Sequence, residues 1–288
     1  MAIPYKKLNA KNILITGGAG FIGSGLVKRL LLNTDANITN LDKLSYCSDL
    51  SSINNLKEKI QNNVRYNFLK IDLANEVDTL NSIKEINPDF VFHLAAESHV
   101  DNSINNPKVF VNSNILGTFN LLQACLINYE NMSIKRKNNF RFHHISTDEV
   151  FGELTENGSF NEKSRYAPRS PYSASKAASD HLVKSWYHTY GLPVIITNCS
   201  NNFGPWQYPE KLIPRVIHNA LKGIEIPIYG NGLNIRDWLY IEDHLDGILL
   251  AALKGDVGDS YCIGGDGELT NLELVHSICN YLDKNVPK

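Results

Sequence analysis

Residues 11–23 read KNILITGGAGFIG, and this stretch decides the fold. Lys11–Thr16 is a short apolar run that stops at glycines, as a buried strand does. Apolar residues then recur at helical spacing over Phe21–Leu32. Small residues between a strand and a helix let the backbone approach a pyrophosphate, and the helix start offers free N–H groups. The glycines that supply this are Gly17, Gly20 and Gly23.

A carboxylate follows at the position that such a unit needs. Ile38–Leu41 reads as the second strand, and Asp42 closes it about 20 residues after the glycines. A carboxylate there accepts hydrogen bonds from the adenosine ribose and repels a 2′-phosphate, which favours NAD over NADP. A glycine triplet alone also occurs in plain turns, but strand, glycines, helix and aspartate together argue for a cofactor site. Asp72, after Tyr66–Ile71, is placed to meet the adenine, although a helix cap explains it equally well.

Strands and helices alternate along the first 200 residues. Asp89–Leu94, Phe140–Ser146 and Val194–Asn198 read as further strands, and Val109–Tyr129 and Tyr172–Tyr190 as long helices. This alternation predicts an α/β fold: a Rossmann-like doubly wound parallel sheet. After Ser200 prolines punctuate the chain and strands shorten. We therefore expect an NAD-binding domain at 1–200 and a smaller substrate-binding lobe at 201–288, with some segments crossing between them.

Composition narrows the class of protein. The chain has 288 residues, 43% hydrophobic and 20% charged, as in an ordinary soluble protein. A net charge of −2 suggests neither a nucleic-acid nor a membrane partner. The five cysteines are scattered and odd in number, which fits reduced thiols in a cytoplasm. We expect no signal peptide at Met1–Lys11, no membrane span and no metal site.

Tyr172 and Lys176 are four residues apart, so they lie one helical turn apart on one face. An unperturbed tyrosine has a pKa of about 10, too high for a base at neutral pH. A neighbouring ammonium and a bound nicotinamide cation would favour the phenolate. Tyr172 could then take a proton from a substrate hydroxyl. The alternative is a chance pair on a solvated helix face, but the preceding strand ends at Ser146-Thr147, where doubly wound sheets place ligands.

Thr147, Asp148 and Glu149 lie just after that strand. An enzyme that only moves a hydride has no need of two extra carboxylates, whereas one that also removes water does. Each carboxylate alone could equally cap the next turn. Beside Thr147 and ahead of the Tyr/Lys pair, acid–base catalysis is the better interpretation.

These motifs resemble the extended short-chain dehydrogenase/reductase family and, within it, the 4,6-dehydratases of dTDP-glucose. The resemblance runs through nearly the whole chain. It is carried by TGGAGFIGS (16–24), LAAESHVD (94–101), FRFHHISTDEVFG (140–152), YSASKA (172–177), TNCSNNFGPWQYPEKLIP (197–214), RDWLYIEDH (236–244) and YCIGG (261–265). The STDEV and SNNFGP…PEKLIP segments are the specific ones, since epimerases of the group usually lack the Asp-Glu pair.

The resemblance implies a reaction in three steps, yielding a 4-keto-6-deoxy sugar on the way to rhamnose and related sugars. Tyr172 deprotonates the C4 hydroxyl while hydride passes to NAD. Glu149 then removes the C5 proton and Asp148 protonates the leaving C6 hydroxyl. Hydride returns to C6. Thr147 bonds the C4 oxygen, and Lys176 holds the nicotinamide ribose.

The resemblance also implies binding residues. Besides the glycines, Tyr172 and Lys176, those for NAD are Phe21, Ile22, Asp42, Lys43, Leu44, Ser45, Asp72, Leu73, Leu94, Ala95, Ala96, Glu97 and Asn202. Those for the sugar nucleotide, besides Thr147, are Ser98, Asn201, Lys211, Leu212, Tyr229, Arg236 and Asn271. The Arg236 guanidinium suits a diphosphate, although an ion pair with Asp237 is the structural alternative.

Family members dimerise through two long helices, here Val109–Tyr129 and Tyr172–Tyr190, which implies a homodimer with a four-helix interface. Other functions stay open: a UDP-sugar 4,6-dehydratase, a 4-epimerase, or a shortened non-catalytic NAD-binding subunit. The non-catalytic subunit is an alternative because the chain ends at Lys288, whereas members of the family normally continue for several dozen residues. We therefore expect a form that is short at its C-terminus.

Overall fold

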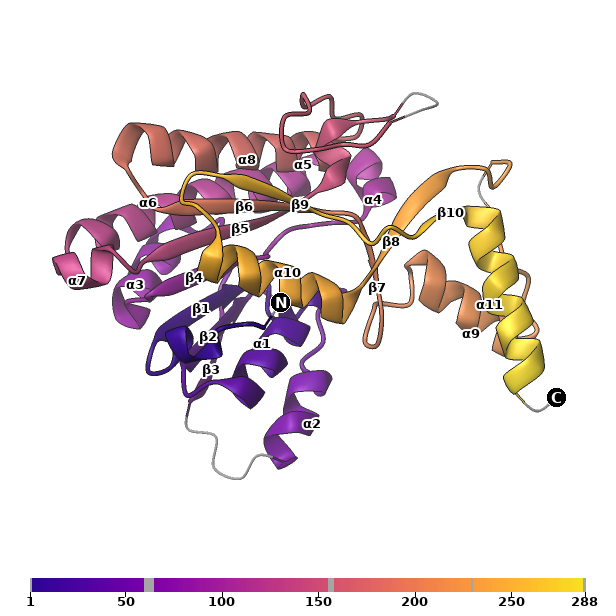
Figure 1. Ribbon diagram of the computed structural model, residues 1–288, viewed down its shortest axis with the longest axis horizontal. Helices are drawn as coiled ribbons and strands as arrows, with labels where there is room; N and C mark the ends of the chain where they lie inside the picture. Colours follow the sequence, from indigo (N-terminus) through magenta and orange to yellow (C-terminus); the bar gives the residue numbers. More distant parts are fainter. Residues whose placement is uncertain (1, 60–64, 155–157, 229, 287–288) are drawn as a thin grey trace. The chain divides into compact units, whose positions relative to one another are not determined.

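A computed structural model describes residues 2–59, 65–154, 158–228 and 230–286 (Figure 1). The chain divides into two compact units. The first comprises Met1–Asn198 and Leu245–Cys262, and the second comprises Cys199–His244 and Ile263–Lys288. Residues 245–262, expected in the smaller lobe, thus belong with the first unit. Their helix joins α1 (Phe21–Asn33) through an ion pair between Arg29 and Asp246, and the Lys7 ammonium donates to the Leu253 carbonyl at 3.0 Å.

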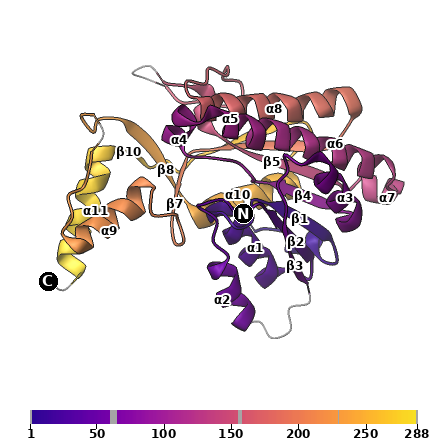
Figure 2. The same ribbon diagram turned by 180° about the vertical axis from the view of Figure 1, so that it is seen from behind.

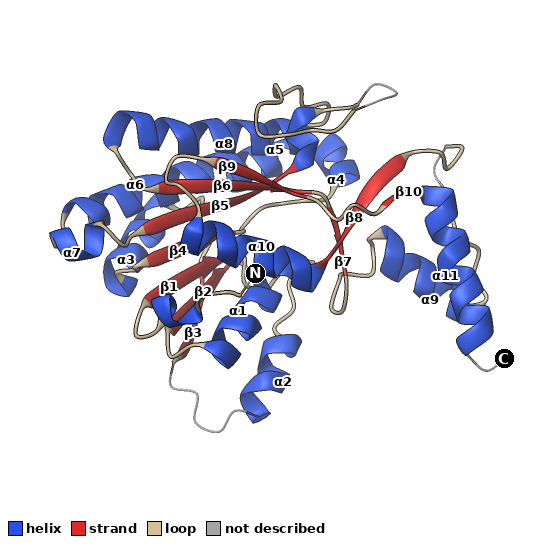
Figure 3. Cartoon of the chain, in the orientation of Figure 1, coloured by secondary structure: helices blue, strands red, loops and turns tan. Residues whose placement is uncertain are grey.

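The first unit is built on a seven-stranded sheet in the order β3-β2-β1-β4-β5-β6-β9 (Figure 3). Neighbouring strands are parallel in the pairs β3–β2, β2–β1, β1–β4 and β4–β5. The order reverses between β1 and β4, which is where doubly wound sheets bind ligands. The strands are β1 (Asn12–Thr16), β2 (Asn37–Asp42), β3 (Tyr66–Lys70), β4 (Phe90–His93), β5 (Arg141–Thr147), β6 (Val194–Cys199) and β9 (Ser260–Ile263). The predicted doubly wound parallel sheet is confirmed.

Helices cover both faces of this sheet, so its central strands are buried on both sides. Every residue of β4 and β6 is buried. On one face α3 (Glu76–Ile86), α6 (Gly117–Glu130) and α8 (Pro171–Tyr190) pack over Leu14, Val91 and Phe142 (Figure 2). On the other face lie α1, α2 (Ser51–Lys59) and α10 (Ile241–Lys254). The remaining elements of this unit are η1 (Tyr5–Leu8), α4 (Val100–Asn105), α5 (Pro107–Phe110), η2 (Val111–Leu116), α7 (Ile134–Lys137) and η3 (Asp148–Phe151).

The helix expected over Val109–Tyr129 is interrupted. It is formed by α5, then one π-helical turn, η2, and then α6. The Asn114 carbonyl in that turn accepts hydrogen bonds from Thr118 Oγ1 at 2.5 Å and Ser179 Oγ at 2.6 Å. Hydroxyls that take a backbone carbonyl in this way widen a helix locally. Pro107–Glu130 is long and apolar enough to span a membrane, but 56% of its most apolar window is buried, as in a core helix of a soluble protein.

Local signals set the ends of α8, the helix that carries Tyr172 and Lys176. Ser170 and Ser173 form a capping box, and Pro171 occupies the first turn, where its missing N–H costs nothing. Gly191 ends the helix in the left-handed conformation, at φ 68°.

The second unit holds a three-stranded sheet in the order β10-β8-β7. Its strands are β7 (Asn201–Phe203), β8 (Ile235–Tyr240) and β10 (Glu268–Thr270). β8 pairs with β10 antiparallel and with β7 parallel. Two helices, α9 (Leu212–Lys222) and α11 (Asn271–Asn285), pack on each other. A capping box of Thr270 and Glu273 begins α11.

Candidate active site

The glycine loop between β1 and α1 is tightly packed against the loop that follows β4. Gly17 has φ +72°, and a Cβ there would lie 2.6 Å from the Ala95 backbone nitrogen. A Cβ on Gly23 would lie 2.2 Å from the Gly17 carbonyl oxygen. Side chains at either position would push these segments apart. The glycines therefore bring the α1 N-terminus, with its free N–H groups, to the point where the sheet order reverses.

Asp42 is buried at the end of β2 and holds that loop. Its Oδ2 accepts from the Ala19 N–H at 3.0 Å, while Oδ1 accepts from the Leu44 N–H at 2.8 Å and from Ser48 Oγ at 3.2 Å. Leu44 takes a left-handed φ of 58° to make its bond. Carboxylate oxygens accept more than one hydrogen bond each, so Asp42 keeps capacity for ribose hydroxyls.

The segment Leu94–Glu97 is fixed from two sides. The Glu97 carboxylate pairs with the Lys43 ammonium at 2.7 Å. The Asn114 side chain accepts from the Glu97 N–H at 2.8 Å and donates to its carbonyl at 3.0 Å. The same amide donates to Ser175 Oγ at 2.9 Å, and Ser175 lies between Tyr172 and Lys176 in α8. Asn114 therefore joins a predicted cofactor loop to the helix of the predicted catalytic pair, a role the sequence analysis missed.

Asp72 makes a local turn. Its Oδ1 accepts from the Ala74 N–H at 2.9 Å, whereas α3 is capped by Asn75. The neighbouring Leu73 is buried, and its carbonyl accepts from Asn120 Nδ2 at 2.8 Å. The helix-cap alternative for Asp72 is therefore not seen in the described part of the chain; a local turn uses one of its oxygens, and its contact with an adenine remains a prediction.

The three residues after β5 form one compact turn. Thr147 caps η3: its hydroxyl accepts from the Glu149 N–H at 3.2 Å and donates to Asp148 Oδ1 at 3.2 Å. Thr147 is also held from β6, since Asn198 Nδ2 donates to its carbonyl at 3.1 Å. Asp148 and Glu149 thus follow directly after the carboxyl end of β5, in a turn held by Thr147.

Tyr172 and Lys176 lie in the first turns of α8. Both are buried, and the Lys176 ammonium donates to the Ile145 carbonyl of β5 at 2.9 Å. The Tyr172 ring meets Phe110 edge-on, with centroids 6.4 Å apart. The exposed-face alternative is therefore excluded for this pair. α8 packs on β5 and on η3, so the helix that carries the Tyr/Lys pair adjoins the Thr-Asp-Glu turn, and their convergence on one substrate remains a prediction.

A buried network beneath Lys176 was also missed. His144 Nε2 lies 3.4 Å from Lys176 Nζ and 3.1 Å from Asp180 Oδ1. Asp180 follows Lys176 by one helical turn, a spacing visible in the sequence. His144 belongs to a buried strand and gives no such local signal.

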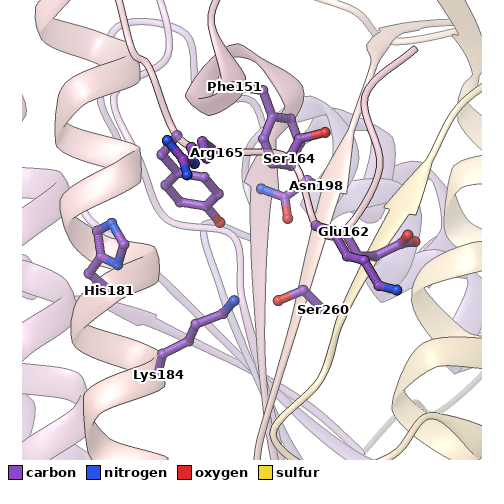
Figure 4. A pocket seen from close by; sticks show the side chains of 10 residues that line it. Phe151, Glu162, Ser164, Arg165, His181, Lys184, Asn198 and Ser260 are labelled. Carbon is purple, nitrogen blue, oxygen red and sulfur yellow. The ribbon is translucent and has the colours of Figure 1, made fainter. Parts of the chain in front are cut away.

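A separate pocket of about 400 Å³ opens beside this network (Figure 4). His181 and Lys184 reach into it from α8, with Glu162 and Ser260 opposite. Tyr166 and Asn198 also line it. It contains none of the predicted catalytic residues.

Most predicted sugar-nucleotide residues lie in the second unit, and Ser98 lies in the first. Asn201 begins β7, Lys211 precedes α9, Leu212 begins α9, Arg236 lies in β8 and Asn271 begins α11. Tyr229 lies outside the described residues. Arg236 is exposed and its guanidinium donates to the Ile235 carbonyl, while Asp237 accepts from the N–H groups of Gly265 and Gly267 at 2.7 and 2.8 Å. The alternative of an ion pair with Asp237 is not seen among the described residues.

Asn202, predicted to contact NAD, also belongs to the second unit. Its amide donates to the Ser200 carbonyl at 2.9 Å, and its oxygen lies 2.7 Å from His244 Nδ1. That contact remains a prediction, as do the sugar-nucleotide contacts.

Fold and site together define a class of protein. It is a Rossmann-type short-chain dehydrogenase/reductase that has, besides the Tyr/Lys pair, two adjacent carboxylates, Asp148 and Glu149. The family model described as GDP-mannose 4,6 dehydratase matches residues 14–287. The chain is 50% identical over 285 residues to a dTDP-glucose 4,6-dehydratase of Salmonella typhimurium, covering 96% of this chain and 78% of that protein.

Solved structures agree. The dTDP-glucose 4,6-dehydratase of Bacillus anthracis, in complex with NAD, matches with a TM-score of 0.81 and 42% identity, over 96% of this chain and 83% of that one. DesIV of Streptomyces venezuelae, a dTDP-glucose 4,6-dehydratase with NAD and TYD bound, matches with a TM-score of 0.86 and 39% identity, over 94% and 81%. The chain therefore belongs to the GDP-mannose 4,6-dehydratase family and, within it, to the dTDP-glucose 4,6-dehydratases.

Proposed function

We propose that this chain dehydrates dTDP-glucose to its 4-keto-6-deoxy derivative: oxidation at C4, loss of water across C5–C6, and hydride return to C6. The observation that carries the proposal is the turn at 147–149, which supplies a hydroxyl and two carboxylates and packs against α8, the helix of Tyr172 and Lys176. The relatives from Salmonella typhimurium, Bacillus anthracis and Streptomyces venezuelae are named for this reaction, and the structures of the latter two contain NAD.

The residues around the glycine loop fit NAD. The loop exposes the α1 N-terminus to a pyrophosphate, and the Asp42 carboxylate suits ribose hydroxyls while repelling a 2′-phosphate. Lys176 would hold the nicotinamide ribose. When bound, NAD supplies the acceptor for the C4 hydride and the donor for C6.

The first proton transfer falls to Tyr172. The buried Lys176 ammonium favours the phenolate, because an adjacent positive charge stabilises an anion in a low-dielectric site. The phenolate takes the C4 hydroxyl proton as that carbon is oxidised. Thr147, held by the Asn198 amide, would donate to the C4 oxygen.

The elimination falls to the carboxylates. The C4 ketone acidifies the C5 proton, which Glu149 removes, while Asp148 protonates the departing C6 hydroxyl. Glu149 later returns its proton to C5. Over one cycle the proton gained by Tyr172 matches the proton lost by Asp148, so one exchange between them restores the resting charges.

The test is parallel incubation with dTDP-glucose and UDP-glucose, scored by mass for loss of one water and by the alkali-induced absorbance of a 4-keto sugar. We expect water loss from dTDP-glucose. Water loss from UDP-glucose alone would assign a UDP-sugar dehydratase, and inversion at C4 without water loss a 4-epimerase. NAD binding without any turnover would leave only a cofactor-binding subunit.

A homodimer is part of this proposal. Apolar side chains remain exposed along η2 and α6: Val111 at 49%, Leu116 at 41%, Phe119 at 38% and Ile127 at 40%. α6 lies beside α8 (Figure 2), and a second copy placing the same two helices on this face would make a four-helix interface. Phe119→Glu should then yield a monomer by light scattering, whereas Leu32→Glu, at an even more exposed apolar site on α1, should leave the dimer intact.

We infer a cytoplasmic enzyme, because all five cysteines are free thiols, as a reducing compartment keeps them. Its product would enter the synthesis of rhamnose or a related deoxysugar. Fractionation of cells that produce the chain tests the first point.

A further inference from the structure

Asp180 is a fully buried carboxylate that the reaction does not use directly. It lies one turn after Lys176, on the same face of α8. A buried charge is unfavourable unless it is paired and hydrogen-bonded. The surroundings of Asp180 meet both conditions.

Its hydrogen bonds come from three segments of the first unit. Oδ2 accepts from Ser146 Oγ at 2.9 Å, Tyr166 Oη at 2.8 Å and Asn198 Nδ2 at 3.2 Å. Oδ1 lies 3.1 Å from His144 Nε2. Burial alone would raise the pKa of Asp180, but these bonds, with His144 and Lys176, hold the pKa below its ordinary value. The carboxylate is therefore an anion at neutral pH.

Its counter-charge is Lys176. Burial, and then the charge of Lys176, lower the pKa of His144 to about 4, so this imidazole is neutral at pH 7. Burial likewise lowers the pKa of His93, and burial with Asp180 raises that of Tyr166. His144 Nε2 stands 3.4 Å from the Lys176 ammonium and 3.1 Å from the Asp180 carboxylate. One neutral imidazole therefore lies between a buried cation and a buried anion.

We propose that Asp180, acting through His144, is the positioning residue that keeps Lys176 charged and so keeps Tyr172 usable as a base. A desolvated ammonium loses its proton more easily, and a nearby carboxylate opposes that loss. The same carboxylate fixes Asn198, which holds the Thr147 carbonyl, so charge and geometry are set by one group. Further titratable groups on the elements packed around the pair are Asp148, Glu149, Tyr172 and Cys262.

The decisive measurement is the titration of Lys176 itself. Protein labelled at lysine Cε with ¹³C is followed by NMR from pH 6 upward, and the Lys176 signal is assigned by its absence in Lys176→Met. In Asp180→Asn we expect Lys176 to lose its proton about one pH unit or more below the wild-type midpoint. Tyr166→Phe, which removes a hydrogen bond from Asp180 but no charge, is the matched control and should leave the midpoint unchanged.

An unchanged midpoint in Asp180→Asn, or an equal shift in Tyr166→Phe, overturns the proposal. Should Asp180→Asn not fold, His144→Leu and His144→Gln decide. The one His144 nitrogen near both groups either accepts from Lys176 or donates to Asp180. Glutamine can likewise accept from Lys176, so it should retain the midpoint that leucine lowers, and equal midpoints refute the role of His144.

The catalytic consequence rests on the proposed function. In Asp180→Asn, the alkaline limb of the plot of turnover rate with dTDP-glucose against pH should shift to lower pH together with the Lys176 midpoint. The NMR titration needs no substrate, so absence of dehydration by the wild type would count against the proposed function alone.

Discussion

Gly17→Ala tests whether the glycine loop is shaped by close backbone approach or only by backbone conformation. Gly17 and Gly191 have nearly the same left-handed φ, +72° and +68°. A Cβ on Gly191 meets nothing within 4 Å, whereas one on Gly17 lies 2.6 Å from Ala95 N, 2.7 Å from Ala95 Cα and 2.8 Å from Leu94 C. The two alanine variants therefore share the conformational cost and differ in the clash.

The expected magnitudes follow from that difference. A left-handed alanine costs about 1–2 kcal/mol, which is all that Gly191→Ala should lose in free energy of unfolding. Gly17→Ala should lose a further ~1–3 kcal/mol from overpacking against backbone that cannot rotate away. Because relief requires the 17–23 loop to move from the 94–97 segment, its affinity for NAD should fall at least about tenfold, or ~1.4 kcal/mol.

Denaturant unfolding and calorimetric titration with NAD measure both quantities on the two variants. Gly191→Ala should bind NAD as the wild type does, since Gly191 ends α8 at the opposite end from Tyr172. The reasoning is refuted if Gly17→Ala loses no more stability than Gly191→Ala and still binds NAD with wild-type affinity.

Three other predictions address the chemistry and the charges. Glu149→Gln should keep C4 oxidation but lower the rate of dehydration by about 10²–10⁴-fold, whereas Tyr172→Phe should stop the reaction before oxidation. Stopped-flow absorbance of NADH distinguishes the two variants. Full product formation by Tyr172→Phe would contradict the role of Tyr172 as the base. Asp42→Ala should weaken NAD binding by about tenfold or more, because it removes a charged acceptor from the Ala19 and Leu44 N–H groups. The ratio of the affinity for NAD to the affinity for NADP should also fall. Unchanged affinities for both cofactors in calorimetric titrations would exclude this role of Asp42. Stability should fall as pH drops from about 6.5 toward 4, because the pKa of His144 is lowered from 6.5 to about 4 and the unfolded chain takes up the proton first. Urea unfolding of His144→Gln across that pH range should show a smaller loss of unfolding free energy per pH unit than the wild type. An equal dependence on pH in both proteins would mean that His144 contributes nothing to the loss.

Much of the site could be predicted because its signals are local. The strand, glycines and helix of 11–33 form one β–α unit, and its boundaries follow from apolar periodicity. Tyr172 and Lys176 share a helix face by spacing alone, and Thr147 ends a strand that reads as apolar. In each case the physical cause lies within a few residues of the effect.

The π turn at Val111–Leu116 could not be predicted in this way. One hydroxyl that takes the Asn114 carbonyl within this turn belongs to Ser179, 65 residues further along the sequence, where no local signal reveals it. The return of residues 245–262 to the first unit has a similar cause, since Arg29 and Lys7 near the start of the chain hold that segment.

The sequence by itself thus determined the class of sheet and the glycine loop, and it supplied the candidate reacting side chains, because periodicity and spacing are properties of neighbouring residues. Only the tertiary structure decided which groups hold those side chains. Asn114 meets Ser175, and His144 meets both Lys176 and Asp180, because parallel strands and their crossover helices bring together residues 32 to 61 positions apart. Burial then makes those contacts matter, since charges and amides removed from water must find their partners inside the protein.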